Sequence, residues 1–368
     1  MKNESIPWWQ IDFGKSAAAA AAREVSKGHV SMGETTRKFE EVICEFLGVK
    51  YCVATSSGTT ALQMALIASN VGFNDVVAVQ DRSWIAAAHA AHLLGARIQL
   101  IDVERDLPVL NIEHVEAIIK TRPKVIILIH MNGRSNQLKL IVNKCKAKGI
   151  IVIEDAAQAF GSKSEGNFLG TLGDIGCFSL SVTKTLSSGQ GGFCVTNSHS
   201  VYKKLVSLRL HGAVDLLTPK WQEFGMNFRY FDIQAAIALN QFSKLNTTIK
   251  RQCSIRKKYE DKLAGLRDLR LLTLDKNKGE VGPYFDIYTK KAKIVIAKLK
   301  HYGIQSRQFY PSIATAKYLK VLNRKEIKNA HHWHKSGVIL PSGPSLTDDQ
   351  IEYISNILIH SPMGSKIN

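Results

Sequence analysis

From residue 50 to about residue 200, short runs of β-branched and other apolar residues alternate with longer stretches that are alanine-rich or amphipathic. Such an alternation is typical of repeated strand–helix–strand units. Strands are predicted at Tyr51–Ala54, Val76–Val79, Ile98–Val103, Val125–His130, Ile150–Glu154, Gly176–Leu180 and Gly192–Thr196. Helices are predicted between them, at Thr59–Ala68, Ser83–Leu94, Ile112–Lys120 and Gln137–Ala147.

The predicted strands are continuous apolar runs and not alternating ones. Val125–Ile129 reads VIILI and has no period of two, so both faces of this strand are expected to be buried. The expected fold class is therefore α/β, with a mostly parallel sheet flanked by helices. Such sheets place ligand sites beyond the carboxyl ends of their strands, so the residues after each strand are the candidates for chemistry.

The pattern changes after Leu239, where a lysine-rich helical stretch continues to about Leu263. The other elements expected in this part are two strand-like pieces and two helices, at Arg270–Leu274, Tyr284–Tyr288, Ala292–Tyr302 and Leu346–Leu358. We therefore expect a large α/β domain over residues 1–245, with an N-terminal segment, and a smaller C-terminal α+β domain over residues 246–368.

Length and composition are those of a folded chain of two domains. The 368 residues are 45% hydrophobic and 22% charged, and one domain typically has ~100–200 residues. No run approaches the ~18 consecutive apolar residues that a membrane helix needs, so no membrane association is expected. Met1–Ser5 leads into Trp8 and Trp9 without the apolar core of a signal peptide, which predicts a cytoplasmic protein.

Cysteines and charges add two further expectations. The 6 cysteines are scattered without a CxxC pair, which is the pattern of reduced thiols, and no metal site is expected. The stretch from Lys244 to Arg307 contains 17 Lys and Arg but only 6 Asp and Glu. Such a stretch can be a solvated face, attract a small anionic substrate or bind nucleic acid. Because no nucleic-acid-binding motif accompanies it, nucleic acid is not expected as a partner.

Four segments that follow predicted strands carry candidate chemistry. The first contains Ser57, Gly58 and Thr59, between a strand and a helix. Backbone N–H groups and hydroxyl groups converge at such a helix N-terminus, where the helix dipole favours an anion such as phosphate. The alternative is an ordinary helix N-cap.

The second segment ends a very apolar strand with Glu154 and Asp155 and continues to Gln158. A buried aspartate needs a cation or a proton donor as its partner, and a heterocyclic nitrogen would serve. The alternative is a carboxylate that caps the next helix. This segment therefore predicts either a site for a nitrogen-containing ring or a structural cap.

The third segment runs from Phe178 through Ser179 to Lys184 and precedes a glycine-rich stretch. A lone lysine is normally exposed, but a lysine at a hydroxyl-lined strand exit can be partly desolvated, which lowers its pKa and permits Schiff-base formation. The fourth segment contains Arg82 and Trp84. The tryptophan could cover a flat ring, and the alternative for it is core packing.

Together these segments resemble the DegT/DnrJ/EryC1/StrS family of pyridoxal phosphate-dependent sugar aminotransferases, which have the type I fold of aspartate aminotransferase. The resemblance runs from about Gly28 to Leu245 and is weaker from about Gly303 to Leu358. The motifs that carry it are Ser57–Thr59, Glu154–Ala159, Phe178–Ser179 with Thr183–Lys184, Asn227–Arg229 with Ile233–Ala236, Phe309–Pro311 and Leu340–Thr347.

The resemblance implies a role for each candidate residue. Lys184 would form a Schiff base with pyridoxal phosphate and then carry the proton between cofactor and substrate, and Asp155 would pair with the ring nitrogen. The other implied cofactor contacts are Gln158 near the ring oxygen, Trp84 on the ring, Ser57, Gly58, Thr59 and Ser179 at the phosphate, and Asn227 at the phosphate of the neighbouring subunit. The active unit would then be a homodimer with shared active sites.

The implied reaction transfers an amino group from L-glutamate to a keto-sugar. The acceptor expected first is a nucleotide-linked 4-keto-6-deoxy sugar, and the amino sugar formed would be used to build a polysaccharide, another glycan or a secondary metabolite. A subgroup that dehydrates sugars has histidine at the lysine position, so Lys184 favours transamination. Alternative acceptors are a 3-keto sugar, a keto-sugar phosphate or a keto-inositol. A non-catalytic regulatory or assembly protein with this fold is the alternative of another class.

The chain departs from the family pattern near the expected substrate side of the cofactor. We expect the region of Arg82, Asn132, Arg134 and Thr185 to approach the sugar. Arg229 is expected either at a substrate carboxylate or phosphate, or in a structural ion pair. Substrate choice is therefore expected to depend on these positions more than on the residues that hold the cofactor.

Overall fold

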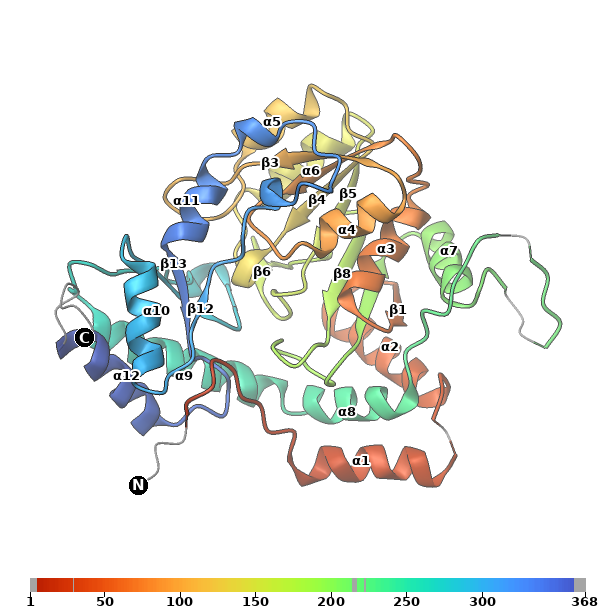
Figure 1. The fold of residues 1–368 in the computed structure, drawn as a ribbon. Helices are drawn as coiled ribbons and strands as arrows, with labels where there is room; N and C mark the ends of the chain where they lie inside the picture. Colours follow the sequence, from red (N-terminus) through yellow and green to blue (C-terminus); the bar gives the residue numbers. More distant parts are fainter. Residues whose placement is uncertain (1–4, 29, 214–216, 222, 361–368) are drawn as a thin grey trace.

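The computed structural model describes residues 5–28, 30–213, 217–221 and 223–360. Met1–Glu4, which belong to the segment considered above for export, lie outside these residues. The larger part of the chain is built on a seven-stranded sheet (Figure 1). Its strands are β1 (Tyr51–Thr55), β2 (Val76–Gln80), β3 (Arg97–Ile101), β4 (Val125–Ile129), β5 (Ile151–Asp155), β8 (Ile175–Ser179) and β9 (Gly192–Thr196).

The strand order of this sheet is β1-β9-β8-β5-β4-β2-β3. The strands from β8 to β3 run parallel, whereas β9 is antiparallel to both β8 and β1. All five residues of β4 are buried, as its uninterrupted apolar sequence predicts for a strand covered on both faces. The predicted α/β class is confirmed, and the seven predicted strands are present with ends that differ by at most two residues.

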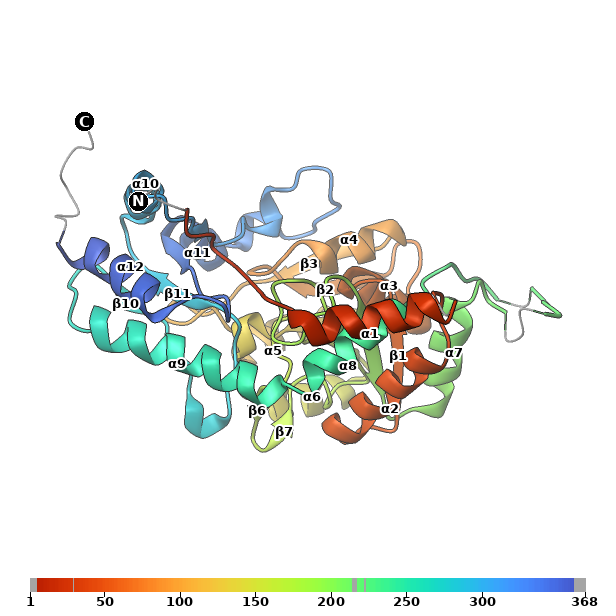
Figure 2. The same cartoon turned by 90° about the horizontal axis from the view of Figure 1, so that it is seen from below.

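Helices flank this sheet (Figure 1). The four that the sequence predicts are α3 (Gly58–Ala68), α4 (Ala86–Leu93), α5 (Ile112–Ile119) and α6 (Leu138–Lys146). Sequence reasoning did not name α1 (Gly14–Ser26), α2 (Glu34–Leu47), α7 (His199–Arg209) and α8 (Asp232–Phe242). Helix α1 packs along α8 (Figure 2), and α2 also contacts α8, so the N-terminal helices cover one side of the larger part.

The smaller part contains a four-stranded antiparallel sheet in the order β10-β11-β13-β12. These strands are β10 (Arg270–Leu271), β11 (Phe285–Tyr288), β12 (Arg307–Gln308) and β13 (Gly337–Leu340). The accompanying helices are α9 (Leu245–Leu263), α10 (Ala292–His301), α11 (Asn329–Ser336) and α12 (Asp348–His360). Side chains of α9, α10, α12, β11 and β13 share one apolar core. The expected domain division at residue 245 stays a prediction.

The N-terminal segment connects the two parts (Figure 1). Ile6 forms a β-bridge with Ile304 of the smaller part, and the chain then passes Trp8 and Trp9 before α1 begins. In the ranges that the structure describes, no helix combines the length and the apolar character that crossing a membrane requires.

Candidate active site

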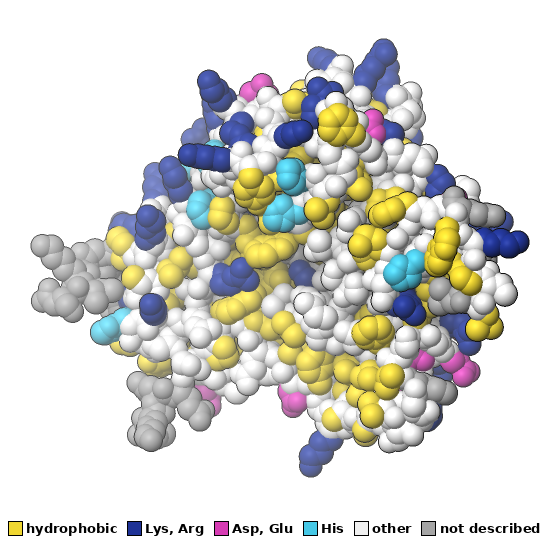
Figure 3. Space-filling model, turned by 45° about the vertical axis from the view of Figure 1, so that its right-hand side comes forward, with side chains coloured by type: hydrophobic (Ala, Val, Ile, Leu, Met, Phe, Trp, Pro, Cys, Tyr) yellow, Lys and Arg dark blue, Asp and Glu magenta, His cyan; other side chains and the backbone are white. Residues whose placement is uncertain are grey.

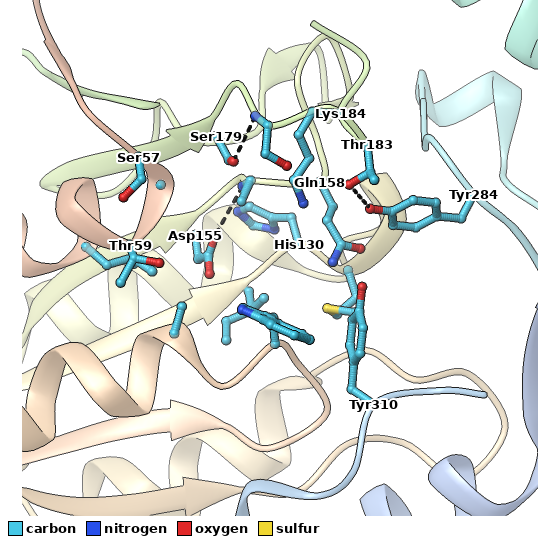
Figure 4. Close-up of a pocket in the computed structure, with 18 of the residues that line it drawn as sticks. Ser57, Thr59, His130, Asp155, Gln158, Ser179, Thr183, Lys184, Tyr284 and Tyr310 are labelled. Carbon is cyan, nitrogen blue, oxygen red and sulfur yellow. Dashed lines mark hydrogen bonds between the residues drawn. The ribbon is translucent and has the colours of Figure 1, made fainter. Parts of the chain in front are cut away.

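A cavity of about 320 Å³ lies where three strands of the larger sheet end (Figure 4). Ile129, Asp155 and Ser179 are the last residues of β4, β5 and β8, and all three line it. This is the edge at which parallel sheets place ligands. The predicted cofactor residues that line the cavity are Ser57, Gly58, Thr59, Trp84, Asp155, Gln158, Ser179 and Lys184.

The N-terminus of α3 has the features of both an N-cap and an anion site, the two interpretations of its sequence. Ser57 is the N-cap, because its Oγ accepts a hydrogen bond of 3.1 Å from the Thr60 N–H. The N–H groups of Gly58 and Thr59 have no partner within the helix and remain available to an anion in the cavity. A Cβ atom on Gly58 would lie 2.8 Å from Cβ of Ser179, so glycine is what lets the helix end approach this strand so closely.

Asp155 faces the cavity from the end of β5 (Figure 4) and is only 8% exposed. Its Oδ1 accepts a hydrogen bond of 3.0 Å from the Ala157 N–H, whereas Oδ2 has no hydrogen bond from any described residue. Burial raises the pKa of Asp155, although the Ala157 N–H and the charge of Lys184 oppose this shift. The described residues between β5 and β6 (Lys163–Ser164) form no helix, so the helix-cap alternative is wrong.

Lys184 lies in the loop after β8, and its side chain points into the cavity (Figure 4). Its backbone N–H donates a hydrogen bond of 3.0 Å to the Ser181 carbonyl, which fixes the turn that carries it. The residue is partly accessible through the cavity, but protein atoms surround the amine, and this burial lowers the pKa of Lys184. Tyr310 and Asp155 oppose the shift without cancelling it. A lowered pKa favours the neutral, nucleophilic amine.

His130 follows β4 and lines the cavity near Asp155 (Figure 4). Its Nε2 lies 2.8 Å from Oε2 of the fully buried Glu154. Burial alone would raise the pKa of Glu154, but hydrogen bonds from His130 and from the N–H groups of Gly170 and Gly173 hold it below its usual value. Glu154 therefore fixes the imidazole in place. Sequence reasoning did not assign His130 to the site, although the position of His130 directly after the buried strand β4 is a signal that could have indicated it.

Two tyrosines that sequence reasoning did not assign to the site complete the cavity from the smaller part (Figure 4). Tyr284 and Tyr310 both line it. The Trp84 ring packs edge-on against Tyr310, with 5.2 Å between the ring centroids. Trp84 is 55% exposed, so its core-packing alternative is wrong and its ring is free to cover a ligand. Burial raises the pKa of Tyr310 to about 12.

Asn227 and Arg229 lie away from the cavity of their own chain. Neither is among the described residues that line it, and Asn227 is exposed in the segment before α8. Its Oδ1 accepts a hydrogen bond of 2.9 Å from Nε of Arg229. The expected contact of Asn227 with a phosphate in the neighbouring subunit stays a prediction.

Four residues expected near the sugar are buried and absent from the described lining of the cavity: Arg82, Asn132, Arg134 and Thr185. Arg134 Nη1 and Asn132 Nδ2 each lie 2.8 Å from Oδ2 of Asp286 in β11. Arg82 stacks on the Phe309 ring at 3.8 Å. Partners distant in sequence engage three of them and join the larger part to the smaller one. Their neighbours Trp84, Met131 and Lys184 do line the cavity, so the expectation that this region approaches the sugar stays a prediction.

The fold and the cavity define the class of the protein: it is a pyridoxal phosphate-dependent aminotransferase with an α/β large domain. The chain belongs to the DegT/DnrJ/EryC1/StrS aminotransferase family, whose sequence model matches residues 12–359. The resemblance on which the site was predicted is thereby confirmed.

Similar solved structures and relatives extend over nearly the whole chain. A DegT DnrJ EryC1 StrS aminotransferase from Brucella abortus has a TM-score of 0.86 and 27% identity, and the match covers 93% of this chain and 94% of that one. DesV of S. venezuelae, solved with a ketimine intermediate, has a TM-score of 0.88 and 25% identity, with 96% and 98% covered. A GDP-perosamine synthase of Escherichia coli O157:H7 is 30% identical over 88% of this chain and 89% of its own.

The residues present fit pyridoxal phosphate. Oδ2 of Asp155 is a free acceptor for a ring nitrogen, Lys184 supplies a nucleophile for an aldehyde, and the N-terminus of α3 supplies donors for a phosphate. Gln158 Oε1 accepts a hydrogen bond of 3.1 Å from the Asn132 N–H, which leaves its amide N–H groups for the cavity. The predicted residues therefore offer a partner for each polar end of the cofactor.

Proposed function

We propose that this enzyme transfers an amino group from L-glutamate to a nucleotide-linked 4-keto-6-deoxy sugar. The observation that carries the proposal is that Lys184 and Asp155 face one cavity, at the ends of the paired strands β8 and β5. Relatives named GDP-perosamine synthase, in Escherichia coli O157:H7 at 30% identity and in Vibrio cholerae at 27% identity, support a nucleotide-linked sugar as the acceptor. Lysine at position 184 favours transamination over dehydration.

Bound pyridoxal phosphate supplies an aldehyde that exchanges amines and a ring that accepts electrons from the substrate carbon. In our proposal Nζ of Lys184 holds the cofactor covalently and, once released, moves a proton to or from that carbon. Asp155 keeps the ring nitrogen protonated through its unpaired oxygen. The remaining proposed contacts are Ser57, Gly58, Thr59 and Ser179 at the phosphate, Gln158 at the ring oxygen and Trp84 on the ring.

The proposal includes a homodimer in which Asn227 reaches the phosphate of the partner's cofactor. Asn227 is exposed and lies outside its own cavity, and apolar side chains near it are open to solvent. Trp221 is 71% exposed, Phe224 63% and Phe231 45%. Several exposed large apolar side chains in one short segment are typical of an interface between proteins.

Subunit mixing tests this shared site. Lys184→Ala and Asn227→Ala homodimers should each be nearly inactive, while a mixture that has exchanged subunits should regain activity, because one of the two sites in each hybrid then carries both native residues. No recovery, with exchange verified by mass spectrometry of the intact dimer, would contradict the sharing of residues between subunits.

The substrate is tested by incubating the enzyme with L-glutamate and a panel of nucleotide-linked 4-keto and 3-keto sugars. Mass spectrometry should detect an amino sugar from a 4-keto substrate. Lys184→Ala should abolish it, whereas Lys203→Ala, which changes an exposed lysine of α7, should not. Turnover of 3-keto sugars alone would identify a 3-keto sugar as the acceptor in place of the proposed 4-keto sugar. Turnover of none of the panel would favour a keto-sugar phosphate or a keto-inositol as the acceptor. Protein that binds no cofactor would favour the non-catalytic alternative.

The expected cytoplasmic location is part of the proposal. Fractionation of cells that express the tagged chain tests it, and activity should be recovered with the cytoplasmic fraction.

A further inference from the structure

Arg307 of β12 is a charged residue of the cavity to which the proposed chemistry gives no role. Its guanidinium group forms no hydrogen bond or ion pair with any residue that the structure describes. Asp155, Lys184 and Arg307 line the same cavity, and the charge of Arg307 contributes to the lowered pKa of Lys184. In Figure 3, two dark-blue side chains lie beside yellow side chains near the middle of this face. Arg307 is therefore a positive charge of the cavity that no described carboxylate pairs with.

Aromatic rings hold the guanidinium group in place. Its central carbon lies 4.5 Å from the ring centroid of Trp8 and 5.4 Å from that of Tyr310. Such cation–π contacts occupy no N–H donor, so the guanidinium group can still bind a carboxylate or phosphate through two parallel hydrogen bonds. Arg307 is thus oriented and has unused donors.

The N-terminal segment supplies one of these rings and is itself fixed. The Trp8 N–H donates to Oε1 of Gln305 over 3.4 Å, and Nε1 of Trp9 donates to the Val182 carbonyl over 2.7 Å. The Trp8 ring also packs on Tyr284, with 6.0 Å between the centroids. Residues far apart in the chain therefore converge to hold one arginine.

The position of Arg307 separates it from the expected phosphate site of the cofactor. In Figure 4, Ser57 and Thr59 lie on one side of the Lys184 side chain and Tyr310 lies on the other. Arg307 lies in β12 and over the Tyr310 ring, so it reaches the cavity from the smaller part, whereas the N-terminus of α3 belongs to the larger part. An anion bound there would be part of a substrate and not the cofactor phosphate.

We propose that Arg307, held by Trp8 and Tyr310, binds an anionic group of a substrate. This inference rests on the proposed function, in which both substrates carry such a group: a carboxylate on the amino donor and a pyrophosphate on the sugar nucleotide. The carboxylate and the pyrophosphate both present paired oxygens to a guanidinium group. The experiment below distinguishes between these two anions.

Calorimetric titration of the cofactor-loaded enzyme with glutarate and, separately, with GDP tests the proposal without turnover. Arg307→Gln should weaken the binding of at least one of these probes by about 10- to 100-fold, the usual loss for a hydrogen-bonded charged group. Arg270→Gln is the matched control, because Arg270 also lies over two aromatic rings, Tyr288 and Trp333, but lines another cavity. It should leave both affinities unchanged.

The outcomes separate the sources of the anion. A loss of affinity for glutarate alone assigns Arg307 to the amino donor, and a loss of affinity for GDP alone assigns it to the sugar nucleotide. In either case, the KM of the corresponding substrate should rise in Arg307→Gln. Trp8→Ala should weaken the binding of the same probe by a smaller factor than Arg307→Gln does. Trp8→Phe, which keeps an aromatic ring, should bind that probe with the native affinity. Unchanged binding of both probes in Arg307→Gln, or no binding to the native enzyme, overturns the proposal. Arg307-dependent binding without amination of any keto-sugar would instead contradict the proposed function alone.

Discussion

The hydroxyl groups of Thr183 and Tyr284 lie 3.0 Å apart although the residues are separated by 101 positions in the chain. Thr183 directly precedes Lys184, and Tyr284 directly precedes β11 of the smaller part. The Tyr284 carbonyl in turn accepts a hydrogen bond of 2.8 Å from Nδ2 of Asn132. The loop that carries the lysine is therefore fixed by contacts from both parts of the molecule.

Replacing Tyr284 by phenylalanine removes this hydrogen bond and keeps the ring. We expect a loss of about 1 kcal/mol in the free energy of unfolding and a kcat lower by about 3- to 10-fold, because Lys184 is less firmly placed. Denaturant titration and steady-state kinetics measure the two effects. Tyr288→Phe, which removes a hydrogen bond of 3.0 Å between β11 and His332 of α11, should leave kcat unchanged. An equal fall in both variants would contradict the positioning role.

Asp286→Ala should destabilise the fold strongly. The carboxylate lies 2.8 Å from Arg134 and from Asn132, and the substitution leaves a buried guanidinium without its counter-ion. Breaking a buried pair from one side typically costs about 3–5 kcal/mol. Asp348→Ala breaks surface pairs with Arg251 and Lys258 and should change the melting temperature little, so similar shifts in the two variants would refute this account of the contact.

Asp155→Asn should retain the cofactor and lose most of the activity. The amide keeps the size of the side chain but does not hold a positive charge on the ring nitrogen, so the ring becomes a weaker electron acceptor. We expect kcat to fall by about 10²- to 10³-fold, the usual cost of losing one preorganised electrostatic contact. Absorbance spectra check that the cofactor is still bound. Activity close to that of the native enzyme would contradict the assignment.

The pH dependence of cofactor binding reports on Lys184. Burial lowers its pKa below the usual 10.5, so its neutral amine becomes abundant at a lower pH than that of a free lysine. The rate at which the cofactor-free enzyme captures pyridoxal phosphate should rise with pH and level off below pH 10.5. Since the unfolded chain binds the extra proton between the two pKa values, the stability of the cofactor-free enzyme should also increase with pH across that window. Capture that levels off only above the usual lysine pKa would disagree with a buried amine.

Local sequence patterns were sufficient for the larger sheet and for the cofactor side of the cavity. The apolar run Val125–Ile129 indicates a strand covered on both faces. Asp155 ends another apolar strand, β5, and Lys184 lies in the loop after β8. In a parallel sheet these strand ends meet at one edge, so short motifs that are distant in sequence are brought together by topology alone.

The other side of the cavity could not be read from local patterns. Tyr284 and Arg307 reach it only because the smaller part packs against the larger one, and the two-residue strand β12 is too short to give a periodic signal. The role of Arg134 in joining the two parts was missed for the same reason, since its partner Asp286 is 152 residues away. Such pairings depend on tertiary packing, which a single sequence does not display.

Reduction of the cofactor-loaded protein with borohydride, followed by digestion and mass spectrometry, tests the central claim most directly. The treatment makes the bond between a lysine and pyridoxal phosphate permanent, so the modified peptide identifies the residue that holds the cofactor. The account predicts modification of Lys184 in nearly every chain and its loss in Lys184→Ala. Modification of a different lysine, or a scatter over exposed lysines with Lys184 intact, would contradict it.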